Sequence, residues 1–583
     1  MLRRVLKEVK EYKAVSIATP ICMIVEVIME MLIPFLMASI IDDGVNKGDM
    51  NHILQVGLLM IGVAVIGLIA GVLGGVFGSR ASTGFAKNLR KAMFENIQSF
   101  SFASIDKFST AGLVTRLTTD VNTMQMGYQM FLRMMMRAPS SLIIALVMSY
   151  IISPSIANIY LVAVLVMGVA VFFILRRSMK YFKQAFPKYD ALNESVQENV
   201  SAIRVVKSYV REEYETNKFK KASENIYNIF VKAEGSTVYL NPLMSLTVYA
   251  CIILISWIGA RMIVSSTLTT GELMSLLSYC MNILMSLMIF SMMFVMLSMG
   301  SASLGRIYEV LSEKSDIVNP ENPICEVEDG SIDFDNVSFA YNKNAKSRVL
   351  KNINLHIASG ESIGIIGATG SAKTSMVNLI SRLYDVTEGS LKVGGTDVRD
   401  YDLVTLRDNV SVVLQNNTLF SGSIYDNLRW GNPNATDEEC RHAAELACAA
   451  EFIDRMPDGY NTHIEQGGNN VSGGQKQRLC IARALLKKPK ILILDDSTSA
   501  VDTATDKKIR KAFREEIPGT TRIIIAQRMS SVMDCDRIIV LNNGQIDGVG
   551  SHDELVQNNE IYREVFESQT QGNGDFDEGK EAR

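Results

Sequence analysis

Six long apolar runs fill the first half of the chain and set its predicted architecture. They lie near residues 14–41, 53–79, 134–152, 156–175, 236–260 and 273–304, and the second and sixth contain no charged side chain. A helix of about 20 apolar residues is long enough to cross the hydrocarbon core of a bilayer. The pattern therefore predicts six membrane-spanning helices within residues 1–310.

The loops between these runs alternate in length and in charge. The connections near 42–52, 153–155 and 261–272 are short and carry few basic residues, whereas residues 80–133 and 176–235 are long and rich in Lys and Arg. Basic segments tend to stay on the cytoplasmic side of a membrane. We therefore expect a multi-pass protein of the plasma membrane whose N-terminus, two long segments and C-terminal half are cytoplasmic.

The two long basic segments keep a helical period and turn back near their middles. Residues 83–103 and 113–133 show this period, and about 21 helical residues extend roughly 30 Å. The expected turns lie near 104–111 and 205–214.

Residues 1–13 place apolar side chains on one face and Lys and Arg on the other. That pattern predicts a helix at the membrane surface before the first span.

After residue 310 the pattern changes to short apolar runs separated by polar turns. Residues 311–330 collect Asn, Pro, Glu and Asp, which predicts a linker. Runs at 331–339, 353–357 and 361–366 predict strands, and the last leads into the loop GATGSAKT at 367–374. A strand, a glycine-rich loop, Lys-Thr and a helical pattern form the context of a P-loop, whose amides cradle nucleotide phosphates. Residues 331–569 are therefore predicted to form an α/β nucleotide-binding domain.

Two further patterns suited to phosphates follow within residues 471–502. The first is a small polar group directly before a helical stretch: Ser472, Gly473, Gly474 and Gln475. Such residues expose backbone N–H groups to an anion at a helix N-terminus. The second is the apolar run 491–495, which predicts a buried strand ending at Asp495. An Asp in that position can hold Mg²⁺ beside a nucleotide, as in a Walker B motif.

Taken together, these motifs resemble those of ABC transporters, and nearly the whole chain resembles an ABC exporter half-transporter. The resemblance implies a multidomain membrane protein: an all-α transmembrane domain of six helices with long cytoplasmic extensions, then an α/β P-loop ABC ATPase domain. It implies that the two cytoplasmic turns are coupling helices that dock on ATPase domains. It also implies ATP and Mg²⁺ as cofactors, and a head-to-tail dimer in which each ATP lies between one chain's Walker motifs and the other's signature motif.

The resemblance assigns roles residue by residue. The phosphate-binding positions are Gly367, Ala368, Thr369, Gly370, Ser371, Ala372, Lys373, Thr374 and Ser375. Tyr341 resembles the aromatic residue that stacks on adenine, and Mg²⁺ would meet Thr374, Gln415 and Asp495. The positions assigned to catalysis are Asp496, Gln527, Gln415 of the Q-loop, Asp502 of the D-loop, and the signature residues Ser472, Gly473, Gly474 and Gln475, which would act on the partner's ATP.

Three positions of the chain's own nucleotide site depart from the family's pattern. Position 496 is Asp where the family has the Glu that polarises the attacking water, and position 527 is Gln where it has a His. Asp is one methylene shorter than Glu, and a displacement near 1 Å can cost on the order of 10² in rate. Gln cannot carry the charge that stabilises a transition state. Ala372 replaces a Gly, and we expect ATP binding to persist. The chain's own site is thus predicted to hold ATP and hydrolyse it poorly.

A chain whose catalytic positions are altered but whose signature motif keeps its phosphate-binding residues resembles the degenerate half of bacterial heterodimeric ABC multidrug exporters. We therefore expect ATP-driven export of small hydrophobic or amphipathic compounds, with a second half that supplies an intact Glu and His. Two alternatives stay open at this point. One is a nucleotide-gated or regulatory membrane protein with little turnover, and the other is a homodimeric lipid or peptide exporter in which both changes are neutral.

Composition and charge narrow the remaining possibilities. The chain has 583 residues, is 48% hydrophobic and carries a net charge of −4, so nothing indicates nucleic acid binding. Its eight cysteines and five histidines show no metal-ligand spacing. Residues 570–583 are polar and acidic, which predicts a disordered tail.

Four charged residues interrupt the predicted spans. Glu26 and Glu30 share one face of the first span, and Arg133 and Arg137 share one face of the third. Charges at membrane depth are costly, so these residues either contact a substrate or form structural ion pairs. The sixth span is rich in Met, which suits apolar ligands of varied shape as well as ordinary packing.

Overall fold

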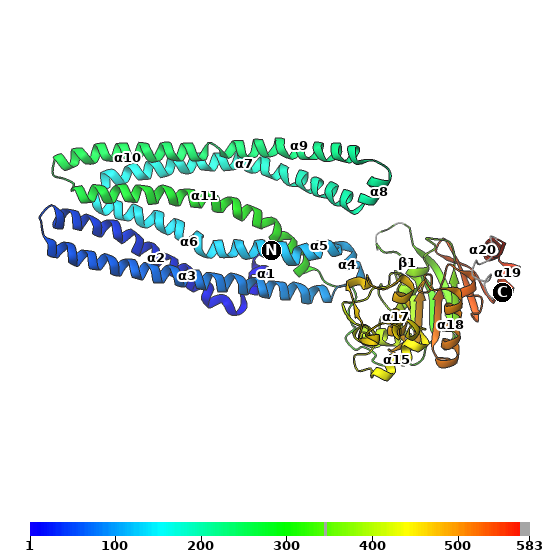
Figure 1. Ribbon diagram of the computed structural model, residues 1–583. Coiled ribbons are helices and arrows are strands. Elements are labelled where there is room, and N and C mark those ends of the chain that lie inside the picture. Colours follow the sequence, from blue (N-terminus) through cyan, green and yellow to red (C-terminus); the bar gives the residue numbers. More distant parts are fainter. Residues whose placement is uncertain (343–344, 346, 572–583) are drawn as a thin grey trace. The chain divides into compact units, whose positions relative to one another are not determined.

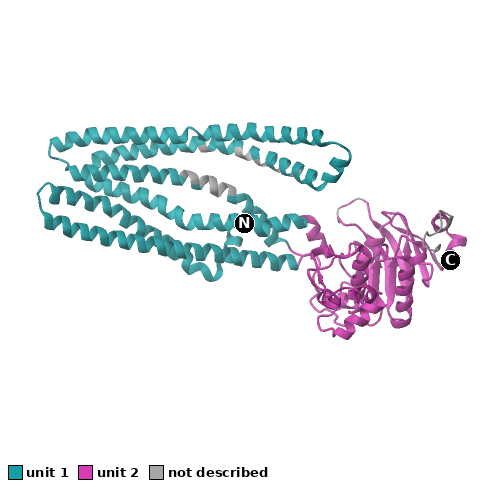
Figure 2. Cartoon of the chain, in the orientation of Figure 1, with its two compact units in different colours: residues 1–98, 109–313 teal, residues 99–108, 314–583 magenta. Residues whose placement is uncertain are grey.

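The computed structural model describes residues 1–342, 345 and 347–571 (Figure 1). Its chain divides into two compact units (Figure 2): unit 1 comprises residues 1–98 and 109–313, and unit 2 comprises residues 99–108 and those from Lys314 onward. Most of the predicted acidic tail, residues 572–583, lies outside the described residues. The last helix, α20 (Glu560–Gln571), reaches two residues into the stretch that was expected to be the tail.

Unit 1 is helical throughout. Six helical stretches within the described residues are long and apolar enough to cross a membrane, which confirms the predicted number: Leu2–Val45, Met50–Gln98, Thr110–Ile152, Pro154–Tyr181, Glu212–Val264 and Thr270–Phe290. The helices that carry them are α2 (Lys13–Ser39), α3 (Met50–Gln98), α6 (Val121–Ile152), α7 (Pro154–Ser201), α10 (Leu240–Val264) and α11 (Thr270–Ser312).

Several of these helices are much longer than a bilayer requires. Helix α3 has 49 residues and α7 has 48, whereas about 20 residues cross the hydrocarbon core. α7 packs along α9 (Glu212–Thr237), and the short α8 (Ile203–Ser208) joins them at the turn (Figure 1). α2 packs against α3 and α6, and α11 packs against α6. The long helical extensions expected from the basic segments are therefore present.

The N-terminal segment differs from the continuous surface helix that was predicted. Helix α1 (Leu2–Val5) is followed by a 3-10 stretch (Leu6–Tyr12) in which Lys10 has a φ of 40°. Val5 and Val9 are buried, and Glu8 is buried between Arg4 and Lys10, each at 2.8 Å. The segment packs on α3 and α11, so Val5 and Val9 are covered by the protein itself, whereas Leu2 and Leu6 stay exposed.

A buried aspartate joins α11 to the stretch that precedes α6. Asp120 is 1% exposed, and it accepts hydrogen bonds from Arg306 Nε at 2.7 Å and from Ser303 Oγ at 2.9 Å. Arg116 adds a second link, at 2.9 Å from Glu309. These contacts fix the C-terminal end of α11 within unit 1.

Asp120→Asn is expected to destabilise unit 1, because the neutral amide presents N–H groups to the guanidinium of Arg306. Charge-assisted hydrogen bonds of a buried carboxylate contribute about 2 kcal/mol, so thermal unfolding of the purified chain in detergent should occur at a lower temperature. Glu198→Gln is the matched control, since it removes an exposed pair with Lys218 and should leave the transition unchanged. Equal melting temperatures for the two variants would refute the role of Asp120.

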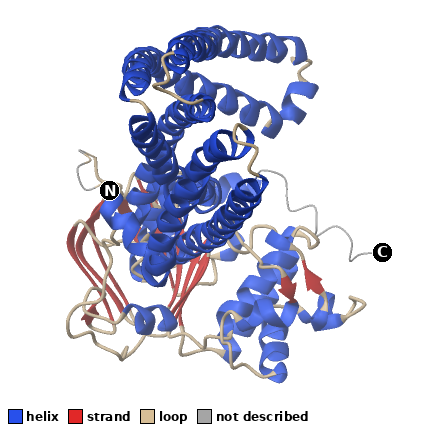
Figure 3. Cartoon of the chain, turned by 90° about the vertical axis from the view of Figure 1, so that its left-hand side faces the viewer, coloured by secondary structure: helices blue, strands red, loops and turns tan. Residues whose placement is uncertain are grey.

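Unit 2 is built on two main sheets, a two-stranded sheet of β7 (Gly422–Ser423) and β8 (His463–Ile464), and surrounding helices (Figure 3). One sheet has the order β2-β1-β4-β5, from β2 (Leu350–Ile357), β1 (Ile332–Phe339), β4 (Glu388–Val393) and β5 (Thr396–Asp397). The other has the order β12-β11-β3-β10-β9-β6, from β12 (Gln545–Gly550), β11 (Arg537–Asn542), β3 (Ser362–Ile366), β10 (Thr521–Ile525), β9 (Ile491–Asp495) and β6 (Val410–Val413).

The second sheet explains why the central residues of its parallel strands are mostly apolar. β3, β6, β9, β10 and β11 pair in parallel, and parallel strands covered on both faces carry apolar residues throughout. All five residues of β9 and of β10 are buried. The carboxyl ends of β3, β9 and β10 meet at one edge of the sheet, where ligands bind in such folds.

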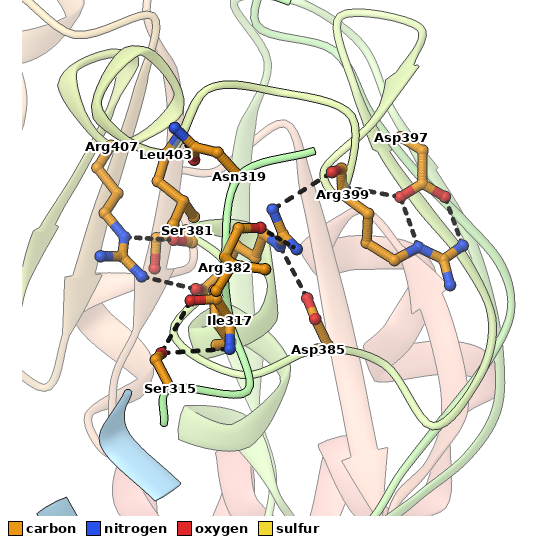
Figure 4. A network of polar contacts seen from close by, with 11 residues as sticks. Ser315, Ile317, Asn319, Ser381, Arg382, Asp385, Asp397, Arg399, Leu403 and Arg407 are labelled. Carbon is orange, nitrogen blue, oxygen red and sulfur yellow. Dashed lines mark hydrogen bonds and ion pairs between the residues drawn. The ribbon is translucent and has the colours of Figure 1, made fainter. Parts of the chain in front are cut away.

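The linker after α11 is tied to unit 2 by a buried arginine (Figure 4). Arg382 is 5% exposed, and its guanidinium donates to Asp385 at 2.9 Å and to the backbone oxygen of Val318 at 3.4 Å. Asn319 donates to Asp402 at 2.6 Å. The first part of the predicted linker at 311–330 is therefore packed on unit 2 rather than free of it.

The first of the two turns expected to be cytoplasmic also belongs to unit 2. Helix α4 (Phe102–Phe108) forms this turn. Asp106 accepts a hydrogen bond from the hydroxyl of Tyr384 at 2.9 Å, and the ring of Phe102 lies 6.1 Å from that of Tyr384. The expected turn near 104–111 thus contacts the sheet-containing unit directly.

Candidate nucleotide site

The loop after β3 has the backbone of a phosphate cradle. A Cβ at Gly367 would lie 2.1 Å from the carbonyl oxygen of Leu541, so the loop can leave β3 here only with a glycine. Helix α12 (Lys373–Ile380) begins directly after the loop. Lys373 Nζ donates to the carbonyls of Gly367 at 2.7 Å and Ala368 at 3.0 Å, and burial lowers the pKa of this ammonium. The lysine is thus folded onto its own loop, where a phosphate would replace the carbonyls as its partner.

Ala372 occupies a backbone conformation that favours glycine. Its φ is 75° and its ψ is 24°, in the left-handed region, and it caps α12. A left-handed residue with a Cβ costs roughly 1–2 kcal/mol relative to the right-handed form. The left-handed backbone conformation is therefore a source of strain at this alanine.

Ala372→Gly is expected to raise the free energy of unfolding of unit 2 by about 1 kcal/mol, because glycine adopts the left-handed conformation without strain. ATP should bind up to about fivefold more tightly, since the cradle is held in its binding conformation at less cost. Titration with a fluorescent ATP analogue and thermal unfolding measure the two effects. Ala368→Gly, at a position without positive φ, serves as the control and should bring no gain; equal gains in both variants would contradict this account.

An aromatic cluster lies beside the cradle. Tyr341 is 49% exposed, and its hydroxyl lies 2.8 Å from Ser375 Oγ at the start of α12. Its ring meets Phe339 at 4.9 Å and Tyr384 at 5.1 Å, both edge to face. The structure therefore places Tyr341 where an adenine could stack next to the cradle. Tyr384, which also contacts α4, was not singled out by the sequence reasoning because nothing in its local pattern marks it.

Asp495 ends β9 close to the start of α12. It is 2% exposed, and burial raises the pKa of its carboxyl above the ordinary range; the adjacent Asp496 acts in the same direction, while a hydrogen bond with Thr374 opposes both. A buried carboxylate beside a threonine hydroxyl provides the oxygen ligands that Mg²⁺ prefers. These two groups fit the magnesium ion of a nucleotide complex, and the predicted ligand Gln415 lies next to Asp496 on the neighbouring strand end.

The side chains at positions 415, 496 and 527 meet at the carboxyl ends of three adjacent strands. Gln527 Nε2 donates to Asp496 Oδ2 at 2.9 Å, and Gln415 Nε2 approaches the same oxygen at 3.4 Å. Asp496 itself has a φ of 48°, and its N–H donates to the carbonyl of Ile525 at 2.9 Å. The structure therefore joins the three residues that the sequence predicted separately, and it engages the Asp496 carboxylate with amide donors.

Two further residues hold this cluster in place and escaped the sequence reasoning. Gln569, on α20, donates to the carbonyl of Gln527 at 2.9 Å and accepts from the N–H of Met529. Arg528 donates to the carbonyls of Val501 at 3.0 Å and Ser499 at 3.1 Å. Both contacts join segments far apart in the sequence, so no local pattern could have indicated them.

The four signature residues form the start of α17 (Gly473–Leu485). Ser472 caps this helix and Gln475 returns the hydrogen bond, which completes a capping box. Ser472 and Gly473 are exposed, and a Cβ at Gly474 would lie 2.7 Å from the carbonyl of Ala500. Within the described part of the chain, no hydrogen bond or ion pair links these residues to the loop at 367–375. The N-terminal end of α17 is therefore open to solvent at Ser472 and Gly473.

Asp502 lies on the segment between β9 and α18 (Thr503–Glu516). It caps α18 by accepting from the N–H of Thr505 at 2.9 Å, and its side chain is exposed. It lies directly after the segment that packs against Gly474 and contacts Arg528. The predicted D-loop position is thus on the surface beside the signature.

Comparison with known proteins agrees with this geometry. Residues 16–288 match the ABC transporter transmembrane region, and residues 350–499 match the ABC transporter family. The uncharacterized ABC transporter ATP-binding protein YfiB of Bacillus subtilis (strain 168) is 35% identical over 568 residues, covering 97% of this chain and 98% of that protein. YknV of the same organism is 30% identical over 576 residues, covering 97% and 94%.

A solved structure of a bacterial Atm1-family ABC exporter with ATP bound has the same fold. Its TM-score is 0.83 with 23% identity, and the match covers 97% of this chain and 100% of that one. The identity to YfiB extends over both units, from the six apolar helices to the two sheets. The chain therefore belongs to the ABC transporter family, as an exporter-type half in which a membrane region of six apolar helices is joined to an ABC ATPase domain.

Proposed function

We propose that this chain is the degenerate-site half of a heterodimeric ABC exporter that moves small hydrophobic or amphipathic compounds out of the cell. The observation that carries this proposal is the contact between Gln527 and Asp496 at 2.9 Å. It brings together the two positions at which the chain departs from the family's hydrolytic residues. The chain's own site would bind ATP with Mg²⁺ and turn it over poorly.

The chemistry of this contact accounts for the poor turnover. A general base must reach the attacking water with a free lone pair. The carboxylate of Asp496 is one methylene short of the family's Glu, and its Oδ2 already accepts from Gln527 and approaches Gln415. A neutral amide at 527 stabilises developing negative charge less than an imidazolium does. ATP, when bound, supplies the phosphoryl group, while Lys373 and the loop amides hold it.

The signature of the chain would serve the partner's site. Ser472 and Gly473 are exposed at the N-terminal end of α17, where backbone N–H groups and the helix dipole attract phosphate. Within the residues that the structure describes, no hydrogen bond or ion pair links Ser472 or Gly473 to the loop at 367–375 of the same chain. We therefore assign the ATP that these residues contact to a second chain. That partner would carry the intact Glu and His.

Two surfaces suit the mechanical connection between the domains. α4, which belongs to unit 2, contacts Tyr384 through Asp106. The second turn, at α8, exposes Tyr209 at 74% and Val210 at 80%, and unit 2 has an open groove of about 370 Å³ with Phe420 and Trp430 stacked at 4.0 Å along it. We assign this groove to the second turn of the partner chain.

The proposal is tested by purifying the tagged chain from its native membranes and identifying the chain that co-purifies. We expect a second ABC half with Glu and His at the corresponding positions, and ATP-dependent uptake of an amphipathic dye into inside-out vesicles by the pair. Purification of a homodimer with full uptake activity would overturn the heterodimer. Nucleotide-dependent ion conductance without uptake would favour a regulatory membrane protein instead.

A further inference from the structure

A groove in unit 1 combines apolar walls with four charged side chains. It has a volume of about 520 Å³ and lies between α2, α3 and α6. Most of its lining is aliphatic, and its charged residues are Glu26, Glu30, Arg133 and Arg137. Glu26 is the middle residue of α2 (Lys13–Ser39), which places it near the centre of the span. Charged groups at that depth are expensive and mark functional sites.

Glycines on α3 provide the space for this groove. A Cβ at Gly71 would lie 3.1 Å from the carboxyl carbon of Glu26, and a Cβ at Gly67 would lie 3.3 Å from Met29 Cβ. A larger residue at either position would press on the α2 side chains beside the groove. Helix α3 thus leaves room for the carboxylate and for the face of α2 that carries it.

The charges in the groove are only partly paired. Arg137 donates to Glu26 at 2.5 Å and to Glu30 at 2.9 Å, so one guanidinium serves two carboxylates. Arg133, one turn away on α6, has no hydrogen bond or ion pair within the part of the chain that the structure describes, and its Nε is buried without a partner. The second oxygen of Glu26 is likewise unpartnered.

Ion pairing within the chain therefore leaves one charge of each sign available. The Glu26, Glu30 and Arg137 group carries a net charge of −1, and Arg133 carries +1. If the cluster served only to hold helices together, pairing Arg133 with a carboxylate would lower its cost in the membrane. The arrangement instead matches a ligand that brings one anionic and one cationic group to an apolar groove.

We propose that this groove binds an amphiphile with a zwitterionic head group, and that it is a substrate site of the transporter. The anionic group, a phosphate or a carboxylate, lies on Arg133, and the ammonium lies on the Glu26 and Glu30 side. The apolar body lies along α3 residues such as Leu68 and Val72. This inference rests on the proposed export function, because it names the class of compound exported.

Equilibrium binding to the full-length chain in micelles of dodecyl maltoside, an uncharged detergent, tests the site. The probe is fluorescently labelled Nα-dodecanoyl-lysine, which carries a carboxylate and an ammonium on one apolar chain. Unlabelled lysophosphatidylethanolamine, also zwitterionic, should displace it. Displacement by dodecyl phosphate or by dodecylamine should each need an about tenfold higher concentration, because each lacks one of the two charged groups. Equal displacement by dodecyl phosphate would overturn the zwitterion class.

Matched variants locate the site. Arg133→Gln should weaken binding of the probe about tenfold or more, and Glu30→Gln should weaken it while sparing dodecyl phosphate. Arg80→Gln is the control, because Arg80 is an exposed arginine on α3 outside the groove. Size-exclusion profiles and binding of an ATP analogue confirm that each variant is folded. Unchanged binding in both groove variants would refute the proposal.

Two further measurements complete the test. One asks whether the bilayer or the solution supplies the ligand, and the other distinguishes a failure of binding from a failure of export. Nanodiscs that contain phosphatidylethanolamine should displace the probe if the bilayer supplies the ligand, and should leave it bound if the ligand is a soluble amphiphile. Uptake of the probe into inside-out vesicles tests export separately. Binding that depends on Arg133 without any uptake would reject the export function and retain the site, whereas uptake unaffected by Arg133→Gln would reject the site alone.

Discussion

Replacing Asp496 with Glu and Gln527 with His is expected to raise ATP hydrolysis by the isolated chain by on the order of 10²-fold or more. The longer carboxylate would reach the attacking water, and the imidazole would stabilise the negative charge that develops on the phosphate. A second copy of the chain can supply the signature, because Ser472 and Gly473 are intact and exposed. The gain should therefore appear without any other protein.

The measurement is steady-state phosphate release from the purified double variant against the unmodified chain, at saturating ATP with Mg²⁺. Each single variant is expected to recover only part of the activity, since the two groups act on one transition state. Lys373→Ala in the double variant should remove the activity, which excludes a contaminating ATPase. A double variant no faster than the original chain would show that these two positions do not limit hydrolysis.

Gly473→Asp, introduced into the same double variant, is expected to abolish the recovered turnover, by on the order of 10²-fold. The carboxylate would face the γ-phosphate bound by the opposite chain and repel it, in the place where backbone N–H groups should attract it. The fold tolerates the change, because a Cβ at Gly473 would lie 3.5 Å from Ala500 Cβ, an ordinary contact. Binding of ATP by Lys373 should persist.

ATP hydrolysis and the binding of an ATP analogue are measured on the same sample. Together they distinguish a loss of turnover from a loss of ATP binding. Gly519→Asp is the control, since a Cβ at Gly519 meets nothing within 4 Å and the residue lies outside the signature. It should leave both quantities unchanged. If Gly473→Asp hydrolysed ATP as fast as its parent, the signature of this chain would not act across the dimer.

The sequence alone predicted those helices and strands that depend on hydrophobic periodicity and motif spacing. The uncharged runs at 53–79 and 273–304 predicted helices α3 and α11, and the run 491–495 predicted β9 to the residue. The P-loop context also placed Lys373 at the start of α12. These features depend on local chemistry, which a single sequence contains.

The sequence could not provide the features that depend on tertiary contacts or on backbone conformation. The left-handed φ of Ala372 follows from the path of the loop, and the pairing of Arg137 with both Glu26 and Glu30 follows from the packing of α6 on α2. Gln569 reaches Gln527 from a helix near the end of the chain. Residues that meet only after folding leave no mark on their own neighbourhood in the sequence.

The central claim is that the chain's own site keeps ATP without hydrolysing it efficiently, and one measurement tests it most directly. The purified chain, alone in detergent with Mg²⁺, is loaded with radiolabelled ATP, and the bound nucleotide and the released phosphate are followed together. This account predicts stable retention of ATP with almost no phosphate released, and release that rises when the co-purified partner is added. Brisk hydrolysis by the chain alone would contradict it and would assign the protein to the homodimeric exporters.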